Sequence, residues 1–349
     1  MNQPREPQPV RFAVVGYGFG GRRFHCPLLA SASACELVGI VTRSPERRAL
    51  VAAEHPGTRC FDDLAQAVDA GIEAVAISTP ARTHSDLTDE AIGLGLHVVC
   101  DKPFALDAAA AARSVDLASQ ADRLLSPYQN RRWDSDFLTV RRLLDEGRLG
   151  DVFRFESRFE RFKPAGPGQA GGGALLDFGS HLVDQALLLF GPVHRVYAEW
   201  RERESGLDDD VFVALTHDGG VRSQLWASWS QGAPGLRFRV SGTEGAYIVD
   251  GPMDGQEPAL VRGDSPATLG DRWGVEPESR WGSIRRGHDH VEIVPTVAGA
   301  WDTFYPRFAA AVRGDGEVPV PAIAAVATSI VLDAARQSAT TGQTVVIAT

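Results

Sequence analysis

The sequence predicts a protein of the α/β class, with an N-terminal doubly wound parallel sheet and a C-terminal α+β domain that contains a large, open, mostly antiparallel sheet. Up to residue 128, short apolar runs alternate with helical stretches, as strands joined by crossover helices do. A glycine motif follows the first apolar run. After Gly150 the hydrophobic period becomes two, which is typical of half-buried strands. We therefore expect a first domain over residues 1–128 and a second over 129–349.

The composition fits two globular domains and argues against several kinds of partner. The 349 residues are 44% hydrophobic and 23% charged, with a net charge of -10. Nucleic acids and anionic membranes attract basic patches, so neither is expected as a partner. The amino terminus lacks a signal-peptide core, and no stretch approaches the roughly 20 apolar residues of a membrane span. We expect a cytoplasmic protein whose four scattered cysteines are small buried hydrophobes.

The first apolar run, Val10 to Val15, leads into glycines 16, 18 and 21 and then a helical stretch that ends at Ser31. In the G-x-G-x-x-G spacing, Gly16 serves the tight turn, Gly18 the close approach of a pyrophosphate, and Gly21 helix–strand packing. The phosphates would lie at the helix N-terminus, where free N–H groups favour an anion. This pattern predicts a Rossmann-type dinucleotide site, and a purely structural glycine turn is the alternative. The loop residues assigned to the site are Gly16, Gly18, Phe19, Gly20 and Gly21.

The end of the second strand, Glu36 to Thr42, is where NAD and NADP are distinguished. An NAD site places an acidic residue about 20 residues beyond the glycines, whereas an arginine there accommodates the 2′-phosphate of NADP. Two hydroxyls and a guanidinium suit a phosphate dianion. We therefore predict NADP(H) as the preferred cofactor, with NAD(H) possible; a solvated basic helix face is the alternative. The residues at this position are Thr42, Arg43, Ser44 and Arg47.

Further strands over 74–78, 97–100 and 124–128 alternate with helices over 83–95 and 107–121. Ligands of doubly wound sheets bind at the carboxyl ends of the strands. We assign the residues that follow two of these strands to the cofactor site, namely Ser78, Thr79, Pro80, His84, Asp101 and Lys102. Lys102 lies between Asp101 and Pro103 and is held at this edge; a surface lysine paired with Asp101 is the alternative.

Residues 174–190 read as a buried helix, because they are apolar nearly all round. Three titratable residues interrupt the apolar pattern. Asp177, His181 and Asp184 are spaced i, i+4, i+7, so they share one stripe of the helix. Covered carboxylates and imidazoles are costly unless they are paired or functional. The stripe therefore indicates a functional site, while a capping Asp177 and a satisfied core histidine form the alternative.

Three motifs taken together resemble the Gfo/Idh/MocA oxidoreductases, over nearly the whole chain. They are Gly16-x-Gly18-x-x-Gly21, Asp101-Lys102-Pro103, and Gly171-Gly-Gly-Ala-Leu-Leu-Asp177-x-x-x-His181-x-x-Asp184. Phe24-His-Cys-Pro27 with Arg131-Arg-Trp-Asp-Ser-Asp-Phe137 looks most like the NADP-dependent scyllo-inositol dehydrogenase branch. The resemblance implies that Lys102, Asp177 and His181 are catalytic and that Thr79 and Pro80 line the nicotinamide side. The assigned substrate contacts are Asn130, Arg132 and Asp184, and for Asp184 the alternative is that it fixes the helix.

The chain departs from that family at two positions. The family usually has glutamate where Asp101 stands and often asparagine where Ala81 stands. The first change shortens a partner of the lysine, and the second removes a possible ribose contact. The stretch 162–173 is rich in glycine and proline and lacks the tryptophan–arginine cluster of close inositol-type relatives. These differences leave the substrate open.

The second half predicts strands over 151–160, 193–200, 210–216, 221–229 and 236–240, with a hairpin turn at 218–220. The helix over 174–190 should cover one face of this sheet, and the other face must be solvated or paired. We expect a homodimer or homotetramer through that face. Residues 251–289 should form a long excursion with Trp273 and Trp281 as anchors or substrate-lining rings. His288 and His290 suggest no third ligand, so no metal site is expected.

These expectations combine into one function. We predict an NADP(H)-preferring oxidoreductase that interconverts a secondary alcohol of an inositol-like cyclic polyol or sugar and its ketone. His181 would accept the hydroxyl proton, Asp177 would orient its ring, and Lys102 would stabilise alkoxide charge. The alternatives are a dehydrogenase or reductase of another sugar or carbonyl compound, a redox-recycling isomerase or glycosidase, and a non-catalytic nucleotide-sensing regulator.

Overall fold

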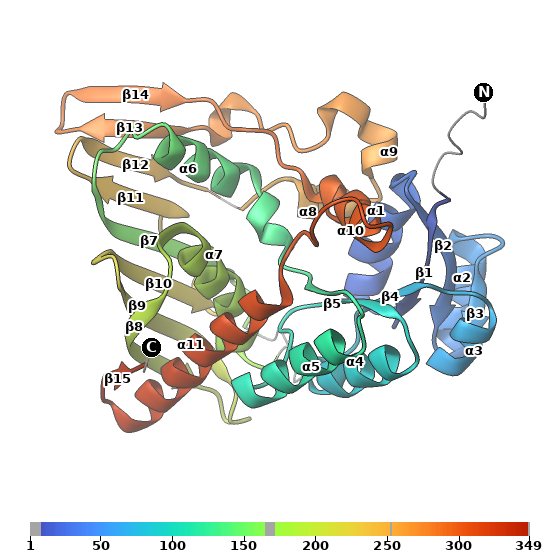
Figure 1. Ribbon diagram of the computed structural model, residues 1–349. Helices are drawn as coiled ribbons and strands as arrows, with labels where there is room; N and C mark the ends of the chain where they lie inside the picture. The colour runs from blue at the N-terminus through green and yellow to red at the C-terminus, as the bar shows by residue number, and fades with distance from the viewer. Residues whose placement is uncertain (1–7, 165–171, 252, 348–349) are drawn as a thin grey trace.

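The computed structural model describes residues 8–164, 172–251 and 253–347 and contains two sheets that lie side by side (Figure 1). The expectations that concern the amino terminus and Gly171 lie outside the described residues. The first sheet has six strands in the order β3-β2-β1-β4-β5-β6, and all of its neighbouring strands are parallel. The predicted doubly wound sheet is therefore confirmed. Its strands are β1 (Val10–Val15), β2 (Cys35–Val41), β3 (Arg59–Phe61), β4 (Ala74–Ile77), β5 (His97–Cys100) and β6 (Leu125–Pro127).

Helices flank both faces of this sheet, and three of them begin at a side-chain cap. Ser44, Asp63 and Asp107 each accept a hydrogen bond from the backbone N–H three residues later, which satisfies a helix-terminal donor. The stretch predicted as one helix up to Ser31 begins instead with a π-helical turn, Gly21–His25, and continues as α1. The helices are α1 (Cys26–Ser31), α2 (Pro45–Glu54), α3 (Leu64–Asp69), α4 (His84–Gly93) and α5 (Ala108–Gln120).

The second sheet has nine strands in the order β14-β13-β12-β11-β7-β10-β9-β8-β15. Among the described residues, β7 and β10 are its one parallel pair, with Phe159 opposite Ala227, so their carboxyl ends reach the same edge. The mostly antiparallel sheet and the hairpin at 218–220 are thus confirmed. The strands are β7 (Val152–Glu160), β8 (Val193–Glu202), β9 (Asp208–His217), β10 (Arg222–Ser228), β11 (Phe238–Gly242), β12 (Gly245–Val249), β13 (Gly282–Arg286), β14 (His290–Val294) and β15 (Val345–Val346).

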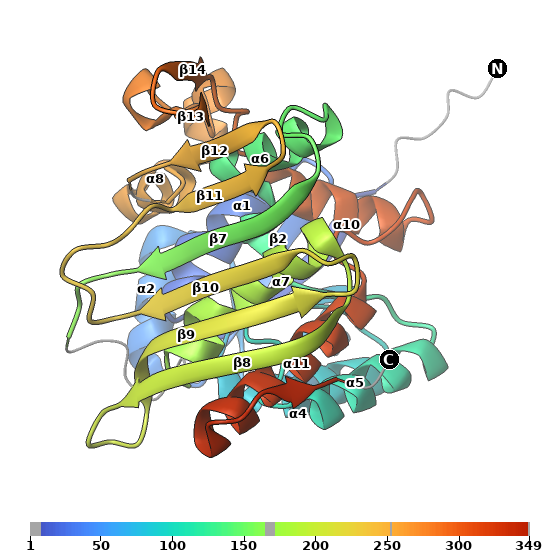
Figure 2. The same cartoon turned by 90° about the vertical axis from the view of Figure 1, so that its left-hand side faces the viewer.

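Helices cover one face of the second sheet, and Figure 2 shows its other face uncovered. The covering helices include α6 (Ser135–Asp145), α7 (Ser180–Phe190) and α11 (Ala322–Thr341). Alternate residues of the strands, such as Phe155, Val213 and Leu225, join these helices in one buried core. The opposite residues of the same strands remain partly exposed, among them Phe212 and Trp226. One sheet face is therefore available to solvent or to a partner.

The end of the chain returns to the first domain. α10 (Phe304–Val312) buries Phe304, Tyr305 and Phe308 in the same core as Phe12 of β1. α11 contacts α5 and β6 as well as β8 and α7, so it lies against both domains. A long excursion was expected over 251–289. The described part of this segment instead contains the helices α8 (Gln256–Arg262) and α9 (Pro266–Leu269) and the strand β13. Trp273 packs into the first-domain core, as an anchor does.

Candidate active site

The glycine motif forms the turn after β1, and each glycine has its own steric role. Gly16 has φ +95°, and a Cβ there would lie 2.4 Å from the carbonyl oxygen of Ser78, so only glycine fits. A Cβ on Gly21 would lie 2.2 Å from the carbonyl oxygen of Gly16. A Cβ on Gly18 would meet no atom within 4 Å. The space beside Gly18 is therefore open at the start of a helical segment, as the approach of a pyrophosphate requires.

A cavity of about 480 Å³, called the interdomain cavity below, lies between the two domains. The carboxyl ends of β4 and β5 form its first-domain wall. Asp101 accepts a hydrogen bond from the Ser78 hydroxyl at 2.9 Å, and its Oδ2 lies 3.3 Å from Nε2 of His25. Burial raises the pKa of Asp101, but the hydrogen bond with His25 holds it below its ordinary value. The predicted cofactor residues that line this cavity are Gly18, Phe19, Gly20, Arg47, Ser78, Thr79, Pro80, Asp101 and Lys102.

A second cavity, of about 450 Å³, adjoins the ends of β1 and β2. The Ser44 hydroxyl accepts a hydrogen bond from the backbone N–H of Arg47 at 3.2 Å and so caps α2 beside this cavity. Arg43 Nε donates to the carbonyl oxygen of Asp62 at 3.0 Å. The carboxylates of Asp62 and Asp63 belong to the same wall. The residues predicted to recognise a 2′-phosphate, Thr42, Arg43, Ser44 and Arg47, all line this second cavity, as does Gly16.

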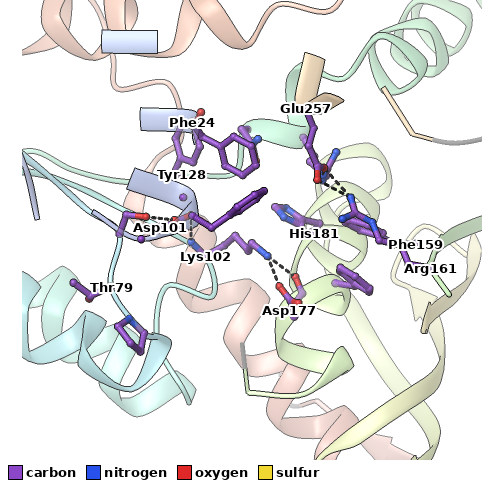
Figure 3. A pocket seen from close by; sticks show the side chains of 18 of the residues that line it. Phe24, Thr79, Asp101, Lys102, Tyr128, Phe159, Arg161, Asp177, His181 and Glu257 are labelled. Carbon is purple, nitrogen blue, oxygen red and sulfur yellow. Dashed lines mark hydrogen bonds and ion pairs between the residues drawn. The ribbon is translucent and has the colours of Figure 1, made fainter. Parts of the chain in front are cut away.

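Lys102 extends from the first domain to the second across the interdomain cavity (Figure 3). Its Nζ donates to the carboxylate of Asp177 at 2.5 Å and to the carbonyl oxygen of Asp177 at 3.0 Å. The two side chains are 24% and 13% exposed, so the pair is sheltered but reachable from the cavity. The fold thus brings a cation of one domain and a carboxylate of the other to the same place.

His181 is buried in the second-domain wall of the same cavity, and its Nδ1 lies 2.9 Å from the side-chain oxygen of Gln129. A carboxamide oxygen only accepts, so Nδ1 carries the hydrogen and Nε2 keeps its lone pair. Burial lowers the pKa of His181 well below its ordinary value, and the nearby positive charges of Lys102 and Arg131 lower it further. The imidazole is therefore neutral at physiological pH and able to accept a proton.

The structure corrects one expectation about the stripe on the buried helix. Asp177 contacts Lys102 instead of orienting the ring of His181, and Gln129 holds that ring. The reason is a π-helical turn at Leu175–Gly179, immediately before α7. Positions four apart stack in an α-helix, but a π-helical turn is wider and rotates them relative to each other.

The three assigned substrate contacts have different locations. Asn130 lines the interdomain cavity. Arg132 and Asp184 do not line this cavity. The guanidinium of Arg132 donates to the two carboxylate oxygens of Asp184 at 2.7 and 2.6 Å, and both side chains are buried. This pair joins the 3₁₀ turn Asn130–Trp133 to α7. It fixes the helix that carries His181, which is a positioning role.

His84 lies behind the cofactor wall, where it is 1% exposed and does not line the cavity. Its Nδ1 is 2.7 Å from the carbonyl oxygen of Pro103, and its Nε2 is 2.8 Å from that of Thr79. Two carbonyl oxygens require two N–H donors, which only the protonated ring supplies. Burial lowers the pKa of His84. Interactions with the Cys100 side chain, the charge of Asp101 and the hydrogen bond to the Pro103 carbonyl outweigh this and raise the pKa to about 9. His84 thus joins the two cofactor-facing loops from behind.

The sequence analysis did not single out much of the second-domain wall. The parallel strands β7 and β10 end at one edge and deliver Phe159, Arg161 and Trp229 to the cavity. Their parallel pairing was the missing signal, because period-two patterns do not reveal strand direction. The residues that complete the lining include Phe24, Tyr128, Arg131, Phe178 and Glu257. Neither Trp273 nor Trp281 lines this cavity.

The described residues contain no group of three or more histidine, cysteine or acidic side chains that could hold a metal ion. None of the described helices is long and apolar enough to cross a membrane.

A dinucleotide-binding loop on one wall of a cavity, with a neutral imidazole on the other, is an arrangement suited to nicotinamide-dependent oxidoreductases. Comparison with known proteins defines the class further. Residues 10–129 match the NAD-binding Rossmann-fold domain of the GFO/IDH/MocA oxidoreductase family. Residues 137–248 match the C-terminal domain of the GFO/IDH/MocA proteins.

The similarity extends over the whole chain. The chain is 35% identical over 341 residues to an uncharacterized oxidoreductase of Escherichia coli, YdgJ, and covers 96% of it. It is 31% identical over 354 residues to the scyllo-inositol 2-dehydrogenase (NADP(+)) IolW of Bacillus subtilis, with 97% of that protein covered. The solved structure of yvaA from Bacillus subtilis matches with a TM-score of 0.91 at 31% identity, covering 99% of this chain and 100% of that one. The chain belongs to the Gfo/Idh/MocA family of oxidoreductases, and its first domain is an NAD(P)-binding Rossmann domain.

Proposed function

We propose that this protein is an NADP(H)-preferring oxidoreductase that interconverts a secondary alcohol of a cyclic polyol or sugar and its ketone. The observation that carries the proposal is the convergence of Lys102, Asp177 and His181 on one cavity beside the dinucleotide-binding loop. The similarity to a scyllo-inositol 2-dehydrogenase (NADP(+)) supports this substrate class.

His181 is the general acid/base of the proposed reaction. The bound nicotinamide supplies the hydride acceptor for alcohol oxidation, so the chain itself must remove the hydroxyl proton. Nδ1 of His181 makes the hydrogen bond to Gln129, so the lone pair of the neutral ring lies on Nε2, which is the atom that can accept the proton. A base in hydrogen-bond reach of the hydroxyl contributes about 10²–10⁴ in rate. The lowered pKa of His181 favours the neutral imidazole, which alcohol oxidation needs as a base, over the protonated ring, which ketone reduction needs as an acid.

Lys102 and Asp177 handle the charge that develops on the substrate oxygen. The ammonium of Lys102 stabilises negative charge on that oxygen, since an oriented cation in a sheltered site interacts more strongly than one in water. Asp177 holds the ammonium in place and keeps the pair neutral when substrate is absent. Arg132 and Asp184 fix the helix behind His181, and His84 fixes the loops behind Lys102.

The second cavity supports the preference for NADP(H). Arg43, Thr42 and Ser44 offer a guanidinium, hydroxyls and the N-terminus of α2 where a 2′-phosphate would be recognised. Replacing Arg43 by serine should weaken NADPH binding about 10- to 100-fold, the loss expected for a charged hydrogen bond, and leave NADH binding unchanged. Calorimetric titration with both cofactors tests this. Equal losses for NADPH and NADH would refute the assignment.

The proposed activity is tested by nicotinamide absorbance with NADP⁺ and NAD⁺ over a panel of inositols, aldoses and their keto forms. We expect accumulation of NADPH with at least one free polyol. Cofactor binding without turnover on any compound of the panel would instead favour a nucleotide-sensing regulator.

We further propose that the uncovered face of the nine-stranded sheet joins two or four copies of the chain. Phe212 and Trp226 lie next to each other on this face, with ring centroids 5.2 Å apart, and Arg158 lies over Trp226 at 3.8 Å. Light scattering during size-exclusion chromatography should give a dimer or tetramer, and Trp226→Glu should give a monomer. A wild-type monomer would refute the proposal.

A further inference from the structure

One buried histidine behind the cavity wall has no part in the proton and hydride transfers. His25 is 0% exposed and ends the π-helical turn that follows the glycine motif. Its Nδ1 lies 2.5 Å from the hydroxyl of Tyr305, and its Nε2 lies 3.3 Å from Oδ2 of Asp101. Tyr305 belongs to α10 and is also buried. The imidazole therefore joins α10 to the first-domain wall of the interdomain cavity.

The hydrogens of this chain can be placed from its donors and acceptors. Among the residues that the structure describes, the Tyr305 hydroxyl makes no other hydrogen bond. A phenol hydrogen that bonds to the lone pair of Nδ1 leaves the ring hydrogen on Nε2. Nε2 is the nitrogen next to the Asp101 carboxylate. At 3.3 Å the contact is longer than the strongest charge-assisted hydrogen bonds, so its attraction is mainly electrostatic.

Asp101 connects His25 to Lys102. Its Oδ2 accepts from the Ser78 hydroxyl at 2.9 Å, and its Oδ1 accepts from the backbone N–H of Lys102 at 2.9 Å. Burial raises the pKa of the Asp101 carboxyl, whereas the contact with His25 lowers it below its ordinary value, so the group is ionised. Both oxygens are therefore held, and a rotation of the carboxylate would break its bond to the Lys102 backbone.

Two π-helical turns, one from each domain, hold the Asp101–Lys102 dipeptide. The turn before α1 ends at His25, which lies beside Asp101. The turn before α7 carries Asp177, which binds Lys102. Such turns are rare and occur frequently at functional sites. In Figure 3 the Lys102 side chain extends from the first-domain wall towards Asp177. The ammonium thus has a partner in front and a support behind its backbone.

An aromatic ring separates the support from the cavity. The ring of Tyr128 lies 4.4 Å from that of His25, and Tyr128 lines the cavity whereas His25 does not. Water from the cavity therefore does not readily replace a partner that is lost at His25. The removal of a buried hydrogen-bonding group without replacement is costly.

We propose that His25 is a positioning residue, which is held by Tyr305 and fixes the Asp101 carboxylate and thereby the backbone from which Lys102 reaches the substrate. The inference rests on the proposed function, in which Lys102 stabilises charge on the substrate oxygen. His25 itself touches neither substrate nor cofactor. It acts through Asp101, so its effect should disappear when Asp101 no longer carries a carboxylate.

Two replacements separate the contact with Asp101 from the contact with Tyr305. In His25→Gln the terminal amide nitrogen extends about as far as Nε2 and can still donate to Asp101. In His25→Asn the amide extends only about as far as Nδ1, so it keeps a partner for Tyr305 and loses the donor to Asp101. We expect kcat of polyol oxidation to fall about tenfold in His25→Asn and about threefold or less in His25→Gln. KM for the polyol should change less than about twofold, because the stabilised charge develops in the transition state.

A double-mutant cycle tests whether His25 acts through Asp101. In the Asp101→Asn background, His25→Asn should lower kcat by no more than about a further twofold. His97→Gln is the matched control. His97 begins β5, the strand that leads into Asp101, and its Nδ1 accepts from the backbone N–H of Leu124 at 3.0 Å, but it does not line the cavity. This control should leave kcat unchanged.

The position of Lys102 can also be followed without turnover, because Lys102 and Lys163 are the only lysines in the sequence. Nuclear magnetic resonance of the NADPH-bound protein with isotope-labelled lysine reports on each side chain. We expect the Lys102 side chain to become more mobile in His25→Asn but not in His25→Gln or His97→Gln. Thermal unfolding checks each variant. If His25→Asn does not fold, Tyr305→Phe takes its place and should lower kcat about threefold, with the same change in Lys102 mobility.

Three results would overturn the inference: an unaltered Lys102 signal in the folded His25→Asn or Tyr305→Phe variant, an equal loss of kcat in His25→Gln and His25→Asn, or losses that multiply in the double variant. A changed Lys102 mobility in a protein that turns over no polyol would instead refute the proposed function and leave the positioning role of His25 supported.

Discussion

The hydrogen bond between His181 and Gln129 makes the activity sensitive to a residue that need not touch the substrate. Gln129 is 5% exposed and His181 is 3% exposed, so water does not readily replace the lost partner in a Gln129→Leu variant. The imidazole then loses the acceptor that keeps the hydrogen on Nδ1 and the lone pair on Nε2. We expect a smaller fraction of His181 in the form that accepts the substrate proton.

The size of the effect follows from the buried hydrogen bond. An unsatisfied buried donor costs about 1–3 kcal/mol. Because about 1.4 kcal/mol corresponds to a tenfold change, kcat should fall roughly 5- to 150-fold. Gln129→Glu keeps an acceptor at the same position and adds a negative charge beside the ring. That charge raises the pKa of His181, so the acidic limb of the pH profile should move to higher pH while kcat at alkaline pH is largely retained.

The assay is initial-rate oxidation of the best polyol with NADP⁺ between pH 5.5 and pH 9, together with NADPH affinity from fluorescence titration. Both variants should bind NADPH as the wild type does, because Gln129 does not line the interdomain cavity. Full kcat in Gln129→Leu would refute the role given to this hydrogen bond. A parallel loss of NADPH affinity would mean that the replacement disturbs the domain junction instead.

Three further predictions concern the same site. His181→Ala should lower turnover by roughly 10²–10⁴ while NADPH binding persists, and normal turnover would exclude His181 as the base. Burial and the Lys102 charge lower the pKa of His181, so the neutral base form persists as pH falls. The value of kcat/KM for oxidation should therefore stay level down to pH 6.5 and decline only below it. A midpoint of the decline above pH 6.5 would contradict the assignment. Asp184→Ala leaves buried Arg132 unpaired and should lower the free energy of unfolding, measured by urea titration, by about 3–5 kcal/mol. The control Glu36→Ala breaks the exposed pair with Arg11 and should lower it by at most about 1 kcal/mol. Equal losses in the two variants would refute the role of the buried pair.

The sequence was sufficient for the two-sheet architecture, although the 11-residue helix α6 was not predicted. The alternation before residue 128, the glycine motif and the period-two runs after Gly150 correspond to the six-stranded and nine-stranded sheets. The three-residue strand β3 and six-residue α3 were missed, since such short segments carry no periodicity. The strand β13 was missed because it ends a stretch rich in glycine, proline and charge.

The sequence was less informative about which side chains face one another. Helix spacing singled out Asp177 and His181, the strand-end position singled out Lys102, and the family resemblance joined the three. All three line one cavity. Their partners depend on geometry that spacing does not contain, because a π-helical turn decides that Asp177 faces Lys102. Glu257 joins Arg161 from 96 residues away along the chain, so only the folded chain brings them together.

The path of residues 301–347 links the two halves of the protein more closely than their sequence order suggests. Trp301, Phe304, Tyr305 and Phe308 fill the interior beneath β1, in the half that begins the chain. A fragment that stopped after β6 would leave these aromatic contacts vacant and present a large apolar surface to water. The nucleotide-binding half therefore shares its core with residues far along the chain, and we expect a fragment that ends after β6 to be less stable than the full chain.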